Sequence, residues 1–261
     1  MRPAMLRHRT ADHIMAKYIP GGLRTWWRRQ EFDPGPLGWM ANPFYFARRG
    51  LRDGLGEFFP RLTGEVLDVG CGRQPYRARL PASRYVGLDL DTPRARATGL
   101  ADAYYDGRTF PFTEGSFDGA LCSEVLEHVF NPGEFLAEIH RVLRPGGCLL
   151  LAVPFVWDEH EQPHDFGRYT SFGLRAVLER AGFEIEAMRR TMADSRTLFQ
   201  LANICVFKRT QPRDRPFSLL AMATVMAPVN LAGIVLGPVL PANADLYIDN
   251  IVLARKPGTG R

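Results

Sequence analysis

Acidic and histidine side chains at short spacing are the first group in this sequence with the residue types that catalysis needs. Glu124, Glu127 and His128 are three and four positions apart, so on a helix their side chains would share one face. Carboxylates hold hard divalent cations, and one histidine among them is compatible with such a site. The spacing therefore allows two interpretations, a metal-binding face or a segment that binds no metal.

A second group lies in the loop that follows an apolar run, Cys148 to Val153. His160 and His164 lie in this loop, followed by Asp165 and Arg168. An imidazole titrates near neutral pH, so His160 or His164 is suited to take a proton from an acceptor hydroxyl. The alternative is that His164, Asp165 and Arg168 hold the loop in place and cap the next helix. We expect one of the two histidines to be the catalytic base.

Both groups must be positioned by a fold. The stretch from Glu65 to Gly72 gives the clearest indication of which fold this is. The apolar residues of this stretch leave no solvent-facing position, which is typical of a strand covered on both faces of a parallel sheet. Gly70 and Gly72 let the chain turn sharply and let a ligand approach the backbone. Asp68 ends the strand, and a helix over Tyr76 to Leu80 would point its free N–H groups at the same ligand. The stretch predicts a nucleotide-type site.

A second predicted strand, Tyr85 to Asp89, again ends in an acid. In a doubly wound sheet such an acid lies beside the glycine loop and accepts hydrogen bonds from both ribose hydroxyls. A dehydrogenase is the alternative for the loop alone, but the fuller Gly-x-Gly-x-x-Gly that it requires is absent.

From about Glu65 to Gly182 the sequence resembles the class I S-adenosylmethionine-dependent methyltransferases, with a type 11-like domain. It departs from many relatives at Gln74, where they carry a third glycine. The resemblance implies S-adenosyl-L-methionine as the cofactor. It also implies that Asp106 accepts a hydrogen bond from the adenine amino group, the alternative being a turn-forming pair with Gly107. The implied cofactor-binding residues are Asp68, Gly70, Gly72, Asp89, Leu90, Asp106, Gly107 and Ser123.

The resemblance extends to both chemical groups. The Glu-x-x-Glu-His spacing matches the metal site of small-RNA 2′-O-methyltransferases and is similar to that of quinone O-methyltransferases. It implies Mg²⁺ on Glu124, Glu127 and His128, with His160 or His164 completing the site. Metal-free relatives carry Glu-His-Val at this point as well. The histidine loop resembles a His-x-x-Pro-(His or Tyr)-Asp-x-x-Arg-Tyr-Thr signature found in methyltransferases.

The predicted fold is α/β, a doubly wound Rossmann-like sheet of seven strands. Its last strand, Tyr247 to Ala254, is expected to be antiparallel. Residues 1–60 are a predicted N-terminal helical extension, with an amphipathic helix over Asn42 to Phe59. Residues 61–261 are the predicted methyltransferase domain, in which residues 191–245 form an apolar helical insertion before the last strand.

The insertion contains an uncharged stretch, Phe217 to Leu240, that is long enough to span a bilayer. We do not expect a span, because a single crossing would separate two strands of one sheet. Pro228 and Pro238 are expected to break the stretch into short helices. A lid over the substrate pocket is the favoured interpretation, followed by a membrane-facing surface and then by a dimer face.

Composition limits the class of protein. The 261 residues suit one α/β domain with additions, and the net charge of +5 comes largely from the first 52 residues. This charge indicates a solvated basic face or contact with an anionic substrate or membrane surface; nucleic acid is not expected, since no binding motif accompanies it. The four cysteines show no paired spacing and no signal peptide is evident, so we expect a cytoplasmic protein, membrane-associated if the insertion faces lipid.

The expected function is methyl transfer from S-adenosyl-L-methionine to oxygen. The acceptor would be a sugar hydroxyl, free or in a glycan, or another small polar or amphipathic metabolite. Two alternatives stay open: N- or C-methylation of a lipid or secondary metabolite, and cofactor binding without catalysis.

Overall fold

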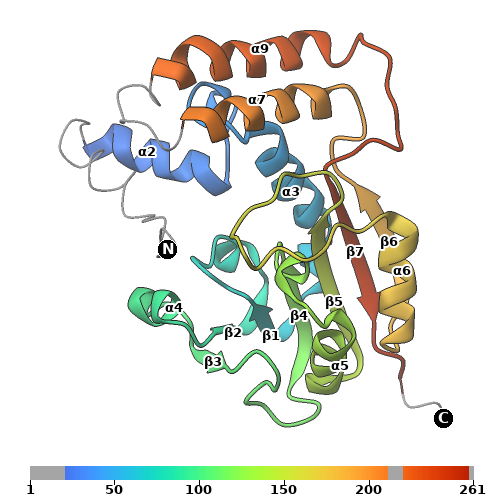
Figure 1. Cartoon of the computed structure of the whole chain (residues 1–261). Helices are drawn as coiled ribbons and strands as arrows, with labels where there is room; N and C mark the ends of the chain where they lie inside the picture. The colour runs from blue at the N-terminus through green and yellow to red at the C-terminus, as the bar shows by residue number, and fades with distance from the viewer. Residues whose placement is uncertain (1–20, 211–219, 259–261) are drawn as a thin grey trace.

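A computed structural model describes residues 21–210 and 220–258 of the chain (Figure 1). Residues 1–20 of the predicted extension and residues 217–219 of the uncharged stretch lie outside these ranges. The centre is a seven-stranded sheet in the order β3-β2-β1-β4-β5-β7-β6. The strands are β1 (Gly64–Val69), β2 (Ala82–Leu90), β3 (Ala103–Tyr105), β4 (Phe117–Ser123), β5 (Leu143–Pro154), β6 (Glu184–Arg190) and β7 (Asp249–Arg255).

All strand pairs in the sheet are parallel except the two pairs formed by β7, which runs antiparallel between β5 and β6. Because β7 follows the insertion, the chain leaves the sheet after β6 and returns beside the same strand. The predicted α/β fold with an antiparallel last strand is confirmed.

Helices cover both faces of the sheet, which explains why its central strands are apolar. On one face α3 packs Leu51 and Leu55 against Leu150 and other strand residues. On the other face α5 and α6 bury Ile139 and Leu174. The helices are α2 (Gly21–Phe32), α3 (Tyr45–Phe58), α4 (Pro93–Thr98), α5 (Pro132–Val142), α6 (Ser171–Arg180), α7 (Arg196–Thr210) and α9 (Ala227–Leu236).

The insertion adds a separate helical layer. Figure 1 shows α7 and α9 lying side by side above the sheet, next to α2 and α3. Buried amides join this layer to the N-terminal extension: Gln200 Oε1 accepts from the N–H groups of Phe46 and Ala47 at 3.1 and 3.2 Å. Trp39 also packs against the apolar cluster at the start of the α9 helix. Among the described residues, no helix is both long and apolar enough to cross a bilayer.

The prediction that Pro228 breaks the insertion is wrong. A π-helical turn over Met222–Met226 runs directly into α9, with Pro228 in its first turn. The wider π turn accommodates a residue that cannot donate the usual helical hydrogen bond. The helix ends at Leu236, shortly before Pro238, as expected.

Two other predicted helices are absent. Residues 76–80 hold only a 3-10 turn, Arg77–Arg79. Glu124 has a left-handed backbone, with φ of 57°, and only Leu126–His128 form a 3-10 turn after it. The i, i+3, i+4 helical face proposed for Glu124, Glu127 and His128 therefore does not exist, and any grouping of these side chains has another origin.

Candidate active site

The glycine loop turns sharply at the carboxyl end of β1. Gly70 has a φ of 72°, and a Cβ atom there would lie 2.4 Å from Val125 Cγ2. Gly72 has a φ of 47°, but a Cβ there would meet nothing closer than Gly70 O at 4.0 Å. Gly70 is thus required by packing, whereas Gly72 leaves open space beside the backbone. Gln74 also has a positive φ of 55°, which explains why glycine suits this position in relatives.

Asp89 lies at the carboxyl end of β2, beside the glycine loop as predicted. Its carboxylate accepts a hydrogen bond from the N–H of Leu90 at 2.8 Å and another from the N–H of Gly72. Burial raises the pKa of Asp89, while these two hydrogen bonds oppose the rise. The side chain is only half-buried, so a ligand can still reach it.

Asp68 is buried below the same loop and is held by a tyrosine. The hydroxyl of Tyr85 donates to Asp68 Oδ2 at 2.5 Å. Burial raises the pKa of Asp68 to about 7, against the lowering effect of this hydrogen bond. The sequence analysis missed Tyr85 as the partner, although its place on the adjacent parallel strand was a usable signal.

The remaining predicted cofactor residues lie along the same edge. Asp106 Oδ1 accepts from the N–H groups of Arg108 and Thr109 at 2.9 and 3.0 Å, which is the turn-forming arrangement. Its side chain is exposed, and adenine contact stays a prediction. A Cβ on Gly107 would lie 3.4 Å from Leu90 Cδ1, so these two predicted residues are neighbours. Ser123, at the end of β4, hydrogen bonds with the side chain of Tyr76.

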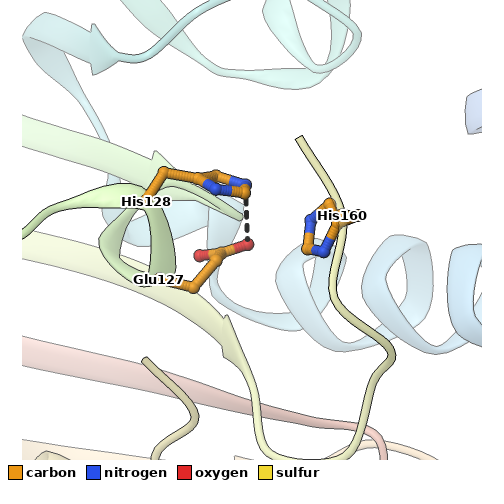
Figure 2. A group of neighbouring side chains, drawn as sticks. All are labelled: Glu127, His128 and His160. Carbon is orange, nitrogen blue, oxygen red and sulfur yellow. Dashed lines mark ion pairs between the residues drawn. The ribbon is translucent and has the colours of Figure 1, made fainter. Parts of the chain in front are cut away.

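Three side chains of the two chemical groups come together after the carboxyl end of β4. One ligand atom from each of Glu127, His128 and His160 lies within 4.8 Å of the others. Figure 2 shows His160 approaching the Glu127–His128 pair from a separate segment of the chain. Glu127 Oε1 lies 3.7 Å from His128 Nε2, and the rings of His128 and His160 have centroids 4.7 Å apart. Glu124 and His164 do not belong to this group.

The histidine loop is fastened to the segment after β4 through its backbone. The N–H groups of Phe166 and Gly167 donate to the carbonyl of Glu127 at 2.7 and 3.2 Å. His164 contributes its carbonyl, which lies 2.6 Å from His128 Nδ1, while its side chain is exposed. These backbone contacts, rather than a helix, bring the two groups together.

Asp165 and Arg168 fix His160. Arg168 donates to both carboxylate oxygens of Asp165, at 2.6 and 2.7 Å, and Asp165 Oδ2 accepts from the N–H of His160 at 2.9 Å. Burial of Asp165 would raise its pKa, but these hydrogen bonds outweigh burial and lower the pKa to about 2. Asp165 and Arg168 therefore hold the loop in place, which is one of the two roles considered for them. The His160 side chain instead lies beside Glu127 and His128.

Two further acids, Glu124 and Asp249, lie near Glu127. Glu127 is fully buried, and neither of its carboxylate oxygens has a hydrogen-bond partner. Burial raises the pKa of Glu124 to about 7, against the charges of Arg48 and Arg168. Asp249 of β7 is also buried, and burial holds its pKa well above the ordinary value. The sequence analysis had not assigned Asp249 to the site, although an acid within an otherwise apolar strand was the available signal.

The helical layer contacts the histidine loop directly. Lys208 of α7 pairs with Asp158 at 2.9 Å. The ring of Phe44 lies between those of Phe207 and Trp157, with centroid distances of 4.7 and 5.7 Å. The predicted lid thus has an apolar, aromatic contact with the loop that carries His160.

Comparison with known proteins agrees with this geometry. Residues 67–151 match a methyltransferase domain family. A probable S-adenosylmethionine-dependent methyltransferase of Mycolicibacterium smegmatis is 32% identical over 136 residues, which cover 47% of this chain and 52% of the relative. An O-methyltransferase of Aspergillus nomiae is 28% identical over 156 residues, covering 50% of this chain and 69% of the relative. The chain thus spans about half the length of the Mycolicibacterium relative.

Solved structures support the fold. The cyclase SpnF superimposes with a TM-score of 0.52 and 24% identity, over 79% of this chain and 81% of that one. The phosphoethanolamine N-methyltransferase 2 of Haemonchus contortus, in complex with S-adenosyl-L-methionine, gives a TM-score of 0.52 and 17% identity, over 94% of this chain and 59% of that one. The glycine loop, the acid after β2, the sheet order and the matched residues lead to one conclusion: residues 67–151 form a methyltransferase domain, and the chain is similar to S-adenosylmethionine-dependent methyltransferases, whose methyl donor is S-adenosylmethionine.

Proposed function

We propose that this chain transfers a methyl group from S-adenosyl-L-methionine to a hydroxyl oxygen of a small acceptor, either a sugar or another polar or amphipathic metabolite. The observation that supports oxygen is the grouping of Glu127, His128 and His160 within 4.8 Å of one another. This group adjoins the glycine loop, since Val125 of the same segment packs against Gly70. A hydroxyl has a high pKa, so it needs such a group more than an amine does.

Methyl transfer depends more on the alignment of donor and acceptor than on covalent catalysis by the protein. The acceptor oxygen must lie in line with the sulfonium carbon, and water must be kept out. We assign the activation of the acceptor hydroxyl to His160 together with Glu127 and His128. His164, the other candidate, would act only through the carbonyl that contacts His128.

The helical layer would supply the exclusion of water. Phe44, Phe207 and Trp157 form an aromatic contact beside the histidine loop, which suits an acceptor with an apolar part. The outer side of α9 exposes Leu231, Val235 and Leu236. Because these apolar side chains are exposed, the proposal includes peripheral contact with a membrane. Co-flotation of the full chain with anionic phospholipid vesicles tests this contact. If the chain stays in the unbound fraction, this part of the proposal is wrong.

The relatives support the proposal to different degrees. The name of the Aspergillus protein favours oxygen, whereas that of the Haemonchus protein names nitrogen. A cyclase on the same fold shows that the architecture alone does not specify methyl transfer. N- or C-methylation and cofactor binding without catalysis are therefore the alternatives against which the experiment is designed.

The test uses S-adenosyl-L-methionine with a labelled methyl group and a fractionated extract of small molecules. We expect a labelled product whose fragmentation places the methyl group on oxygen. His160→Ala is expected to lower kcat by about 100-fold or more, since positioned proton transfer contributes 10²–10⁴-fold. His140→Ala, a change in the half-buried histidine beside Phe183, is the matched control and should keep the rate.

Three results would contradict the proposal. If His160→Ala keeps the full rate, the acceptor needs no activation and nitrogen or carbon is favoured. If His164→Ala abolishes the rate while His160→Ala does not, the assignment of the two histidines is reversed. If the cofactor binds but no acceptor is methylated, the chain is a binding protein.

A further inference from the structure

We propose that Glu127, His128 and His160 bind a divalent first-row transition-metal ion, of the Zn²⁺ or Mn²⁺ type, on the acceptor side of the site. This inference rests on the function proposed above and refines it: an ion held in part by His160 would activate the acceptor hydroxyl, in place of direct proton transfer to the His160 ring. It keeps Glu127, His128 and His160 from the Mg²⁺ site that the resemblance implies, leaves out Glu124 and His164, and names a different class of metal.

The positions of the three ligand atoms fit one ion. All lie within 4.8 Å of one another, and Glu127 Oε1 and His128 Nε2 are 3.7 Å apart. Tetrahedral bonds of about 2.0–2.2 Å place neighbouring ligands roughly 3.4 Å apart, so small side-chain adjustments suffice. The three side chains come from two segments that the backbone of Glu127 already joins to Phe166 and Gly167.

Glu127 forms no side-chain hydrogen bond that would offset its burial, and its ion pair with His128 spans 3.7 Å. Its exposed fraction is 0%, and neither carboxylate oxygen accepts a hydrogen bond. A buried carboxylate without a partner is strongly unfavourable, and paired charges or metal ions are the usual solutions in proteins. The neighbouring side chains of Glu124 and Asp249 are acids too, so neither offers Glu127 a positive charge. A cation between Glu127 and the two imidazoles satisfies this need.

Hydrogen bonds orient both imidazoles for metal binding. His128 Nδ1 lies 2.6 Å from the carbonyl oxygen of His164, so this nitrogen carries the proton and Nε2 has a free lone pair. In the neutral imidazole, Nε2 and Glu127 Oε1 are thus two lone-pair atoms 3.7 Å apart that one cation can bind. His160 Nδ1 lies 3.2 Å from the carbonyl of Asp158, 3.3 Å from Asp165 Oδ2 and 3.5 Å from Arg168 Nη2. The two nearer oxygens favour a proton on Nδ1, so Nε2 keeps its lone pair in the neutral ring. Metal-binding histidines commonly make such contacts with the second ring nitrogen.

The donor set decides which class of metal fits. Mg²⁺ prefers oxygen ligands and keeps several waters, whereas imidazole nitrogens suit Zn²⁺ and other first-row divalent ions. Two imidazoles and one carboxylate therefore favour the latter. With three protein ligands, a tetrahedral ion keeps one position for a water or an acceptor oxygen. A hydroxyl bound there would have a lower pKa and would release its proton to solvent water, which would leave the oxygen as the nucleophile that takes the methyl group from the sulfonium.

The test measures metal binding directly on the full chain after removal of metal with a chelator. Calorimetric titration with MnCl₂ and ZnCl₂ should show about one ion per chain, and MgCl₂ should bind at least about 100-fold more weakly. Titration with CoCl₂ should give visible absorption typical of imidazole coordination. Glu127→Gln and His160→Ala should each weaken Mn²⁺ binding by about 100-fold or more, since even supporting residues contribute 10–100-fold. His140 lies in the last turn of α5, outside the proposed site, so His140→Ala should leave the affinity for Mn²⁺ unchanged.

The outcomes separate this inference from the proposed function. Binding of S-adenosylhomocysteine and the melting temperature show that each variant is folded. If the unmodified chain binds neither Mn²⁺ nor Zn²⁺, or binds them equally after Glu127→Gln and His160→Ala, the inference is overturned and Glu127 and His128 share a proton instead. Metal binding without methyl transfer would contradict only the proposed function. Methyl transfer that is unaffected by the chelator would contradict only the proposed metal site.

Discussion

Asn203 and Asn230 share a hydrogen bond of 2.8 Å between Nδ2 of Asn203 and Oδ1 of Asn230, and both side chains are fully buried between α7 and α9. Asn230 Nδ2 donates further, to the carbonyls of Trp39 and Asn42 at 2.9 and 3.0 Å. One amide thus connects the insertion to the N-terminal extension. These contacts hold α7 over the loop that carries His160.

Asn230→Ala should destabilise the chain by about 3 kcal/mol, because it leaves the buried carbonyls of Trp39 and Asn42 without this donor and removes one of the two hydrogen bonds that Asn203 Nδ2 donates. Chemical denaturation monitored by circular dichroism measures this change. Asn243→Ala is the control, since Asn243 is exposed and bonds only within its own turn. Equal stability of the two variants would show that the buried amides do not hold the layer.

Asp89→Ala should weaken binding of S-adenosylhomocysteine by roughly 30- to 1,000-fold, the equivalent of losing about 2–4 kcal/mol of charge-assisted hydrogen bonding to the ribose. Calorimetry measures the affinity. Asp91→Asn is the control, because Asp91 is exposed and paired only with Arg96. If Asp89→Ala binds S-adenosylhomocysteine with unchanged affinity, the assignment of Asp89 to the ribose hydroxyls is wrong.

Gly70→Ala and Gly72→Ala should show that the first glycine is needed for packing of the fold and the second for binding of the cofactor. Gly70→Ala should cost about 3 kcal/mol of stability, because its Cβ meets Val125 as well as a left-handed backbone, whereas Gly72→Ala should cost only about 1 kcal/mol. Gly72→Ala should instead reduce cofactor affinity. Urea unfolding and calorimetry measure the two effects, and Val125→Ala should recover part of the loss in Gly70→Ala.

Asp68 should make stability depend on pH in an unusual direction. Its pKa rises from 3.8 in the unfolded chain to about 7 in the fold, so between these values the folded state binds a proton that the unfolded state has lost. The free energy of unfolding therefore falls as the pH rises from about 4 to 7, by up to about 4 kcal/mol from this group. Asp68→Asn keeps a partner for Tyr85 and should flatten this part of the profile; identical slopes would contradict the assignment.

The sheet and the cofactor edge were predictable because they depend on local sequence. Short apolar runs that end in Asp68 and Asp89 indicate buried parallel strands, and the glycines between them need positive φ or open space. The acceptor side was predictable only in part. Glu127 and His128 were chosen for a helical face that does not exist, because Glu124 adopts a left-handed backbone.

What brings Glu127, His128 and His160 together is backbone bonding between two loops, and no periodicity in the sequence encodes it. The same limit applies to the helical layer. Asn230 pairs with carbonyls 191 and 188 positions away, so the sequence near either end of the contact carries no sign of the other. Such long-range amide contacts specify a single arrangement only after the surrounding helices have packed.

The link between Asn230 and the carbonyls of Trp39 and Asn42 also governs how this protein can be re-engineered. A chimera that transplants only the segment between β6 and β7 onto another methyltransferase core would carry half of a complementary surface, with Gln200, Asn203 and Asn230 exposed to solvent or facing foreign side chains. The helical layer is therefore transferable from this chain only as a pair of segments, one taken from before the first strand and one from before the last.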